Sequence, residues 1–529
     1  NPMDLLAHSR DTSIFERIPS LVVFPKNKED VSALVRFVTA KRRAGENISI
    51  TARTAGTDMT GGPLSDSIVV SFMKHMNQII EVGKKHIVAE PGVYYRDLEK
   101  ATLAKNGMIV PPYPASREMC ALGGMIANNA GGELTLHYGK MDNYVEELEV
   151  ILADGSEATL KKLSEPELKA KKSLETLEGA IYRSMHALIE HHAEEIQKAK
   201  PSVSKNSAGY ALWDVWDQKK RTFDLTRLFC GSQGTLGLIT RAKVGLEKPK
   251  KHRGMVVIFL SDVSVLPEVV KRVLSFSPES FESYDDHTFT LATRFAGDFI
   301  RQGGFMDMIS LTFAFLPEMW MAVTGGIPKL VLLAEFAEND EETAKDKARE
   351  TRTALRDLPV TARLAFGIME DKYWKIRRES FALLRKHIHG LRAAPFIDDI
   401  VVHPKDYPTF LPELNALLSE YDIMYTIAGH IGDGNFHIIP LVDLKKPEHH
   451  TAILGLTPRV YQLVAKYKGS ITGEHSDGII RTPFLSLMFS PKILELFQET
   501  KRIFDPFNIF NPGKKVGGTV KDIEKYMIG

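Results

Sequence analysis

The chain has 529 residues, 43% of them hydrophobic and 26% charged, which is the composition of an ordinary globular protein with more than one core. Its formal net charge of +1 provides no broad basic surface, so no nucleic-acid partner is expected. Only two cysteines are present, Cys120 and Cys230, which excludes a disulfide framework and a cysteine-bound iron–sulfur cluster in this sequence.

The first part of the chain predicts a unit of mixed helices and strands. Asn27 can cap a helix that carries Val31, Leu34, Val35 and Val38 on one apolar face. Further along, a charged region predicts solvated helices in an insertion, 161–200, to which we assign no chemistry. The pattern predicts strands at 48–53, 68–72, 79–82, 87–90 and 145–152, a helix over 95–105, and a hairpin signal at 153–155.

Three Gly-rich segments lie in this part of the chain, at 54–62, 122–132 and 231–240. None of them is G-x-G-x-x-G or GxxxxGK[ST], so neither a Rossmann fingerprint nor a P-loop is present. A strand that runs into a Gly-rich turn still exposes successive main-chain N–H groups, which bind phosphate without cationic side chains. One such loop is more often a structural turn. Three of them indicate an extended cofactor that contains phosphate.

Beyond the charged run 248–253, which indicates a domain boundary, strands alternate with amphipathic helices. We predict strands at 256–260, 331–336 and 397–402, and helices that end near 275, begin near 341 and end near 421. The tail 503–513 predicts a loop. The most apolar region, 305–333, is interrupted by charges and prolines, so a buried helix and strand are favoured over a membrane span. The first residues carry no signal-peptide pattern.

Residues 428–440, AGHIGDGNFHIIP, predict a hairpin around Gly-Asp-Gly-Asn, since Gly and Asn tolerate the positive φ of a reversal. A turn over these four residues would pair Ile431 with Phe436 and set His430 opposite His437. Opposed residues of an antiparallel pair have Cβ atoms about 5 Å apart. The two imidazoles would then converge as metal ligands do. Two hydrogen-bonded core histidines explain the spacing equally well.

The sequence resembles the FAD-linked oxidases of the vanillyl-alcohol oxidase/p-cresol methylhydroxylase fold, in the branch of D-lactate, glycolate and D-2-hydroxyglutarate dehydrogenases. The resemblance covers about residues 12–515 and is carried, in order, by RTAGTDMTGG, VAEPGV, PPYPASREMCALGGMIANNAGG, GSQGTLGLIT, GHIGDGNFH, GEHSDG and FDPFNIFNPGK. It implies an α+β fold with a two-part FAD-binding domain of p-cresol methylhydroxylase type and an α+β substrate (cap) domain with a largely antiparallel sheet. The domains expected are 1–247, 248–485, and a segment 486–529 that returns to the FAD domain.

The resemblance also implies which residues bind FAD. The pyrophosphate would contact Thr54, Ala55, Gly56, Thr57, Asp58, Met59 and Thr60. The rest of the cofactor would contact Pro91, Ala115, Ser116, Gly123, Gly124, Asn128, Ala130, Gly237, Ile239 and Asn511. Relatives with a covalently attached flavin carry a histidine in the first loop. This loop has none, so non-covalent FAD is implied.

By the same resemblance, His430, His437 and Glu474 would hold a divalent metal, zinc in the first place, with manganese or iron as alternatives. His475 would be the catalytic base. Adjacent strand residues point to opposite faces, so the backbone must turn at Glu474-His475, and Gly473 is expected to allow it. In isolation, this pair would be taken for a surface loop.

A substrate carboxylate requires a fixed counter-charge, and the helix YWKIRRE is similar to the one that carries it in the family. Alignment on the tryptophan matches Arg377, with Arg378 second. A solvated helix face explains these arginines without a substrate. The chain departs from the family at Ser476-Asp477, which adds a carboxylate near the base. It departs again at Ile439, where relatives that oxidise 2-hydroxyglutarate have asparagine.

The implied activity is FAD-dependent, metal-assisted oxidation of a D-2-hydroxy acid to the 2-oxo acid, with hydride passing to flavin N5. The two departures favour a monocarboxylate such as D-lactate over a diacid. Electrons would pass to a separate acceptor: a quinone, a cytochrome, an electron-transfer flavoprotein or an iron–sulfur subunit. A cytoplasmic location is expected, while contact with a membrane face and homo-oligomerisation stay open.

Two other functions fit the same fold. An alkylglycerone-phosphate synthase-like transferase is disfavoured by Glu474, since that branch is expected to carry a His-rich run there. A non-catalytic FAD-binding subunit of a redox complex is disfavoured because every proposed ligand and the base are retained. Within the lead hypothesis, a direct oxidase is less favoured than a dehydrogenase with a separate acceptor.

Overall fold

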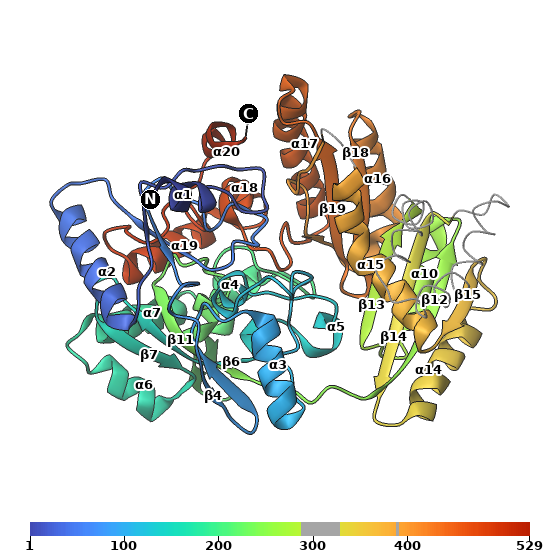
Figure 1. The fold of residues 1–529 in the computed structure, drawn as a ribbon, viewed down its shortest axis with the longest axis horizontal. Helices are drawn as coiled ribbons and strands as arrows, with labels where there is room; N and C mark the ends of the chain where they lie inside the picture. The colour runs from blue at the N-terminus through green and yellow to red at the C-terminus, as the bar shows by residue number, and fades with distance from the viewer. Residues whose placement is uncertain (287–327, 388–390, 529) are drawn as a thin grey trace. The chain divides into compact units, whose positions relative to one another are not determined.

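The chain divides into two units, each with its own sheets (Figure 1). The computed structural model describes residues 1–286, 328–387 and 391–528, and for 379–387 it describes the backbone alone. The first unit comprises Asn1–Gly132, Gly139–Pro249 and Ser470–Gly529, and the second comprises Glu133–Tyr138 and Lys250–Gly469. The expected α+β class, with an FAD-type unit and a second unit built on a large antiparallel sheet, is confirmed.

Residues 470–485, which we expected in the second unit, lie in the first. Hydrogen bonds explain why. The Ser207 N–H donates to the Thr472 carbonyl at 3.0 Å, and the Ile479 N–H donates to the Thr60 carbonyl at 2.8 Å. The chain has therefore re-entered the first unit before it reaches Glu474.

The first unit contains three sheets. A parallel sheet has the order β1-β3-β2, a five-stranded antiparallel sheet has the order β4-β5-β11-β6-β7, and a small sheet has the order β8-β10-β9. The strands are β1 (Leu21–Val23), β2 (Ile50–Arg53), β3 (Ile68–Ser71), β4 (Ile79–Val82), β5 (His86–Ala89), β6 (Val145–Ile151), β7 (Glu157–Lys161), β8 (Leu163–Ser164), β9 (Trp216–Asp217), β10 (Thr222–Phe223) and β11 (Leu238–Gly245).

The helices of the first unit are α1 (Pro2–Ala7), α2 (Lys28–Arg43), α3 (Tyr95–Asn106), α4 (Leu122–Asn128), α6 (Glu165–Lys172), α7 (Leu177–His191), α8 (Ala193–Ala199), α9 (Thr226–Phe229), α18 (Gly478–Arg481), α19 (Pro491–Phe504) and α20 (Val520–Tyr526). The Asn27 side chain caps α2 by accepting from the Asp30 N–H at 2.9 Å, as its sequence predicts. The apolar face of α2 packs with residues of both larger sheets, including Ile50, Val70 and Leu238. This shared core fixes β2, from which the first Gly-rich loop leaves, and β11, into which the third Gly-rich segment runs.

The second unit is an eight-stranded antiparallel sheet covered by helices. Its strand order is β15-β12-β14-β13-β18-β19-β16, and β17 also pairs with β19. The strands are β12 (His252–Leu260), β13 (Ser280–Asp285), β14 (Leu330–Glu338), β15 (Thr361–Ala365), β16 (Arg392–Ala393), β17 (Ile400–Val401), β18 (Met424–His430) and β19 (Asn435–Val442). The helices are α5 (Thr135–Tyr138), α10 (Leu266–Leu274), α14 (Glu341–Ala354), α15 (Ile368–His387), α16 (Tyr407–Ser419) and α17 (Pro447–Lys466).

Helix α15 covers one face of this sheet. Its residues Tyr373, Trp374 and Ile376 pack on a face that includes Met255 and Tyr284. Helix α14 covers the other face, where a Cβ on Gly254 would come within 2.5 Å of the Ala344 carbonyl oxygen. The face under α15 is the one that carries the histidine pair described below.

The predicted strands and helices form in both units, and the hairpin at 153–155 joins β6 to β7. The strand predicted at 397–402 forms only the two residues of β17, and the helices of 161–200 are not all solvated, because α7 buries Ile181, Tyr182 and Met185. The apolar region 305–333 lies outside the described residues except at its end, which belongs to β14. Among the helices of the described residues, none combines the length and apolar character that a membrane crossing requires.

The 428–440 hairpin forms with a different register from the one predicted. His430 pairs with Asn435, and His437 pairs with Ala428, because the turn is a four-residue loop, 431–434, built on a short 3₁₀ segment. Gly434 closes the turn at φ +74°, where a Cβ would clash with the Val402 carbonyl. The register differs by two residues, so both histidines stay on the same face of the sheet.

Candidate functional site

The first Gly-rich loop is organised by the carboxylate of Asp58. This carboxylate accepts hydrogen bonds from the N–H groups of Thr60 and Gly62, both at 2.9 Å, and from the Thr60 hydroxyl at 2.8 Å. It also accepts from the Asn128 amide at 2.8 Å, at the end of α4. Asp58 therefore joins the first Gly-rich loop to the second, and the structure brings these three predicted residues together.

The third Gly-rich segment joins the other two through Gln233. Its side-chain amide donates to the Thr60 hydroxyl at 3.2 Å. The Asn511 side chain donates to the carbonyls of Gly62 and Gln233, at 2.9 and 2.7 Å. Asn511 therefore braces the loops through protein contacts. Our sequence analysis missed Gln233, although it lies inside the segment GSQGTLG.

The predicted glycines stand where a neighbouring segment leaves little room for a side chain. A Cβ on Gly123 would lie 2.6 Å from the Pro91 side chain, and one on Gly124 would lie 2.8 Å from the Thr54 hydroxyl. One on Gly237 would lie 3.0 Å from the Ile151 carbonyl oxygen. Further predicted contacts of the cofactor are Met59, in the first Gly-rich loop, Ala130, two residues after α4, Ile239, in β11, and Ala115 and Ser116, on the loop before α4.

The first loop also offers free main-chain donors. Within the part of the chain that the structure describes, the N–H groups of Ala55, Gly56 and Thr57 donate to no protein acceptor, and each residue is partly exposed. Successive N–H groups of this kind form a site for an anion. The loop therefore fits the pyrophosphate of a dinucleotide cofactor.

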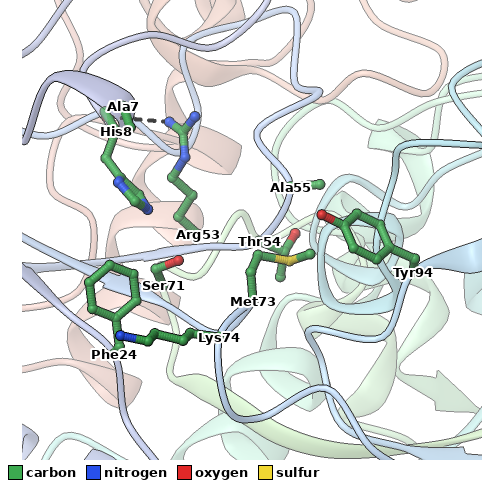
Figure 2. A pocket seen from close by; sticks show the side chains of 10 residues that line it. All are labelled: Ala7, His8, Phe24, Arg53, Thr54, Ala55, Ser71, Met73, Lys74 and Tyr94. Carbon is green, nitrogen blue, oxygen red and sulfur yellow. Dashed lines mark hydrogen bonds between the residues drawn. The ribbon is translucent and has the colours of Figure 1, made fainter. Parts of the chain in front are cut away.

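A cavity of about 270 Å³ opens beside the start of this loop, within the first unit (Figure 2). Its walls include Thr54 and Ala55 of the loop and two cations, Arg53 and Lys74. The Arg53 guanidinium donates to the Arg10 carbonyl at 2.7 Å, which holds this side chain in the cavity wall. The other lining residues are Ala7, His8, Phe24, Ser71, Met73 and Tyr94. The cavity thus continues the loop with a cationic wall, which suits the charged part of a nucleotide.

The loop 473–478, which carries Glu474 and His475, is held in the first unit by three buried lysines. Lys205 lies 2.9 Å from the Glu474 carboxylate, and Lys515 lies 2.8 Å from that of Asp477. Lys140 donates to the Gly473 carbonyl at 2.9 Å. None of these lysines was predicted, because each comes from a distant part of the chain.

This loop also packs on the predicted flavin cradle. The Gly478 N–H donates to the Gln233 side chain at 2.8 Å, and the next N–H, of Ile479, donates to the Thr60 carbonyl. The partly buried His475 is therefore anchored, three residues away, to the first and third Gly-rich segments.

The backbone does turn at Glu474-His475, but Gly473 is not the residue that allows it. Within the loop 473–478, the residues with positive φ are Ser476, at +66°, and Gly478, at +53°. The Ser476 hydroxyl donates to the Gly231 carbonyl at 3.0 Å, which holds this conformation. The additional carboxylate of Asp477 is neutralised by Lys515 and accepts from the Gly209 N–H.

In the second unit, the two histidines of the hairpin lie together. The centroids of the His430 and His437 rings are 5.1 Å apart at an interplanar angle of 88°. His430 Nδ1 lies 2.6 Å from the Glu282 carboxylate, and His437 Nδ1 lies 3.0 Å from that of Asp398. A neutral imidazole that donates its Nδ1–H to a carboxylate has its lone pair on Nε2, the form in which histidine binds a metal. The donor set therefore fits a divalent cation.

Of the two candidate arginines, Arg377 is the one linked to this pair. Its guanidinium lies 3.1 Å from the second oxygen of Glu282, the same carboxylate that contacts His430. Arg378 instead makes two contacts with Glu133, at 2.6 and 3.1 Å, and stacks on the Trp374 ring. The structure therefore associates Arg377, and not Arg378, with the histidines.

The sequence-predicted residues are thus distributed over both units. The FAD-binding residues, Glu474 and His475 belong to the first unit, whereas His430, His437 and Arg377 belong to the second. The carboxylates that contact the histidines, Glu282 and Asp398, were not predicted from the sequence.

Comparison with known proteins shows the family of the chain. The family model described as FAD linked oxidases, C-terminal domain, matches residues 249–515, about half of the chain, and the model described as FAD binding domain matches 19–161. Among curated proteins, a D-2-hydroxyglutarate dehydrogenase of Pantoea ananatis is 27% identical over 97% of this chain. The chain spans about half the length of this and three other bacterial D-2-hydroxyglutarate dehydrogenases.

Other relatives are matched over nearly their whole length. The glycolate oxidase subunit GlcD of Bacillus subtilis is 26% identical, with 99% of this chain and 94% of the relative covered. A D-lactate dehydrogenase of Archaeoglobus fulgidus is 27% identical, with 94% and 91% covered. A solved 4-ethylphenol oxidase from Gulosibacter chungangensis has the same fold, with a TM-score of 0.68 at 16% identity over 98% of this chain and 94% of that one. Since the motifs, the fold and both family models agree, the chain belongs to the FAD-linked oxidases.

Proposed function

We propose that this protein oxidises a monocarboxylic D-2-hydroxy acid, similar to D-lactate, to the 2-oxo acid and passes the electrons to a separate acceptor. The observation that carries the proposal is the histidine pair of the second unit, in which each Nδ1 atom contacts a carboxylate. Relatives named as dehydrogenases of D-lactate and D-2-hydroxyglutarate support the substrate class.

In this proposal His430, His437 and Glu474 are the protein ligands of a divalent metal, zinc first. Their environments support this role, because each imidazole has a carboxylate at Nδ1 and the Glu474 carboxylate has Lys205 beside it. A metal bound there would lower the pKa of the substrate hydroxyl, as it does for bound water. A metal ligand must present a free lone pair, and a carboxylate at Nδ1 fixes the neutral imidazole in the tautomer whose lone pair is on Nε2.

His475 is proposed as the base that takes the hydroxyl proton. Its loop is hydrogen-bonded to Gln233 and Thr60 of the proposed cradle, which supports a position near the cofactor. FAD, held without a covalent bond, supplies the acceptor for the hydride that leaves C2. One proton and one hydride thus account for the two hydrogens that a hydroxy acid loses.

Arg377 is proposed to bind the substrate carboxylate, since it shares Glu282 with His430 and has several N–H donors on one plane. Ile439, two residues after His437, places a buried apolar side chain on the same strand face. An apolar group there offers no partner to a second carboxylate, which favours a monoacid. The acceptor is proposed to be a quinone, a cytochrome, an electron-transfer flavoprotein or an iron–sulfur subunit.

Anaerobic mixing with D- and L-lactate, glycolate and D-2-hydroxyglutarate tests the proposal, with bleaching of the flavin absorption as the readout. We expect D-lactate to bleach the flavin fastest. His475→Ala should slow bleaching by about 10²- to 10⁴-fold, the usual contribution of a general base, while FAD content stays unchanged. His191→Ala, an exposed histidine of α7, serves as the control. A metal- and FAD-loaded parent that no acid bleaches would refute the proposal.

A further inference from the structure

We infer that Glu282 is a positioning residue that couples metal binding to carboxylate recognition, because one carboxylate holds both His430 and Arg377. The inference rests on the proposed function, and it adds a residue that neither the motifs nor the family comparisons single out. It also gives a reason why metal binding and recognition of the substrate carboxylate should depend on each other.

The geometry places the two oxygens of Glu282 on two different partners. Oε1 lies 2.6 Å from His430 Nδ1, and Oε2 lies 3.1 Å from the Arg377 guanidinium. The Glu282 side chain is almost completely buried, at 2% exposure. A buried carboxylate is costly unless its oxygens are occupied by donors, so these contacts hold both partners in place.

The strand register explains why these residues meet. In the antiparallel pairing of β13 and β18, Ser283 pairs with Gly429, and one step along the same register sets Glu282 opposite His430. Opposed residues share one face of a sheet. Helix α15 packs on this face through Trp374, less than one turn before Arg377. The sheet therefore places the imidazole of His430, and the helix places the guanidinium of Arg377, next to the same carboxylate.

Glutamine at this position can satisfy only one of the two partners. If its oxygen accepts from His430 Nδ1–H, its NH₂ group faces the Arg377 guanidinium, a donor against a donor. If it is turned the other way, its NH₂ group faces Nδ1, which then favours the tautomer with hydrogen on Nε2. That tautomer cannot bind a metal through Nε2. The charged guanidinium is the stronger donor, so the amide oxygen should turn toward Arg377 and the NH₂ group toward His430 Nδ1. Glu282→Gln therefore weakens the metal ligand through its tautomer and holds the arginine by a neutral hydrogen bond in place of an ion pair.

The test compares Glu282→Gln with a control, Glu279→Gln. Glu279 directly precedes β13 and also has a buried carboxylate, but its partner is the Tyr138 hydroxyl. Zn²⁺ affinity is measured on metal-stripped protein by competition with a chelator. Glu282→Gln should weaken it by about 10- to 100-fold, the usual effect of removing a carboxylate behind a ligating histidine. At saturating Zn²⁺, the half-saturating concentration of D-lactate for flavin bleaching should also rise, whereas Glu279→Gln should change neither.

A double variant separates the effect on Zn²⁺ binding from the effect on substrate recognition. In the Arg377→Met background, Glu282→Gln should still weaken Zn²⁺ binding but should no longer raise the half-saturating concentration. Fully additive effects would overturn the coupling. So would a Glu282→Gln protein that melts at a lower temperature but keeps the parent's Zn²⁺ affinity and half-saturation.

A further readout does not depend on the proposed function. The ¹⁵N spectrum of histidine-labelled, metal-free protein reports the tautomer of His430, assigned with His430→Gln. The parent should show hydrogen on Nδ1, and Glu282→Gln should shift this signature. If no hydroxy acid bleaches the flavin but the tautomer shifts, the proposed function fails and Glu282 remains a positioning residue. An unchanged tautomer together with unchanged Zn²⁺ affinity overturns the inference.

Discussion

The loop 473–478 of the first unit and the hairpin 430–437 of the second are held in place by opposite charges. Buried lysines hold the loop: Lys140 at Gly473, Lys205 at Glu474 and Lys515 at Asp477. Buried carboxylates hold the hairpin: Glu282 at His430, Asp398 at His437 and Asp399 at Asn435.

The difference follows from the groups that each segment presents. A carboxylate next to an ammonium group stays ionised, and an imidazole next to a carboxylate keeps its hydrogen on Nδ1. The first arrangement provides an ionised carboxylate oxygen, and the second leaves the lone pair of a neutral imidazole on Nε2, which are donor atoms of the kind that a divalent metal binds. The contacts that set the ionisation and the tautomer of these proposed ligands therefore lie within each unit.

The largest effect is expected at the loop, from Lys205→Met. This change leaves the buried Glu474 carboxylate without its ammonium partner, and breaking a buried pair in this way costs about 3–5 kcal/mol. Urea unfolding measures the loss. The double variant Lys205→Met/Glu474→Gln should recover part of it, because it removes the buried charge as well.

The control for this prediction is Lys200→Met, which breaks an ion pair with Asp214 at the surface. Exposed pairs contribute about 0–1 kcal/mol. If Lys205→Met destabilised the protein no more than Lys200→Met, the lysines would not be what holds the loop.

A smaller effect is expected at the hairpin, from Asp398→Leu. Removing the carboxylate at His437 Nδ1 should weaken Zn²⁺ binding by about 10- to 100-fold. Chelator competition on metal-stripped protein measures it, with Asp443→Asn, on the loop after β19, as the control. An unchanged Zn²⁺ affinity would contradict the view that carboxylates prepare the histidines.

The segments of the candidate site could be predicted from the sequence because their signals are local. Gly-rich turns after strands, the Asn27 cap and the period of the α2 face each depend on residues that are neighbours in the chain. The face shared by His430 and His437 was also correct, although the pairing was wrong by two residues. The 3₁₀ turn shifted the register, and a two-residue shift preserves the face of a strand.

The contacts that hold those segments could not be predicted, because they join residues far apart in sequence. Glu282 is 148 residues from His430, and Lys205 is 269 residues from Glu474. Which strands pair, and so which carboxylate faces which histidine, depends on the whole sheet and not on any local pattern. The same limit explains why Ser476, and not Gly473, turned out to adopt the left-handed conformation.

The Gly-rich cradle provides a third type of bracing, in which neutral donors surround a carboxylate, and Asp58→Asn tests it. Four hydrogen bonds to this carboxylate hold the first loop and join it to Asn128. An amide turns NH₂ toward some of these donors, so FAD affinity should fall by about 10-fold, which corresponds to about 1.4 kcal/mol. Titration of the apoprotein with FAD measures it, and Asp97→Asn on α3 should have no effect.

The smallest effect concerns a place where carboxylates outnumber cations. Glu370, in the first turn of α15, lies near the fully buried Glu335, which already receives the Trp374 N–H at 2.6 Å and the Arg253 guanidinium at 3.2 Å. Burial, and then the charge of Glu335, raises the pKa of Glu370 from 4.5 to about 8. In contrast to the hairpin carboxylates, Glu370 therefore stays protonated at neutral pH.

The sign of the pH dependence follows from this pKa. Between pH about 4.5 and about 8 the folded protein holds a proton that the unfolded chain releases, so stability falls as pH rises through this window. Glu370→Gln resembles the protonated form and lacks this loss, so its stability relative to the parent should increase from pH 5 to pH 8. Asp11, whose pKa burial also raises to about 8, contributes a slope of the same sign in both proteins, so the variant should keep a residual slope. Urea unfolding at pH 5, 6.5 and 8 measures the difference, with Glu350→Gln on the exposed side of α14 as the control. If the free energy of unfolding of the parent and of Glu370→Gln changed with pH in parallel, Glu370 would be ionised in the folded protein. Arg253 alone would then stabilise the charges of both buried carboxylates.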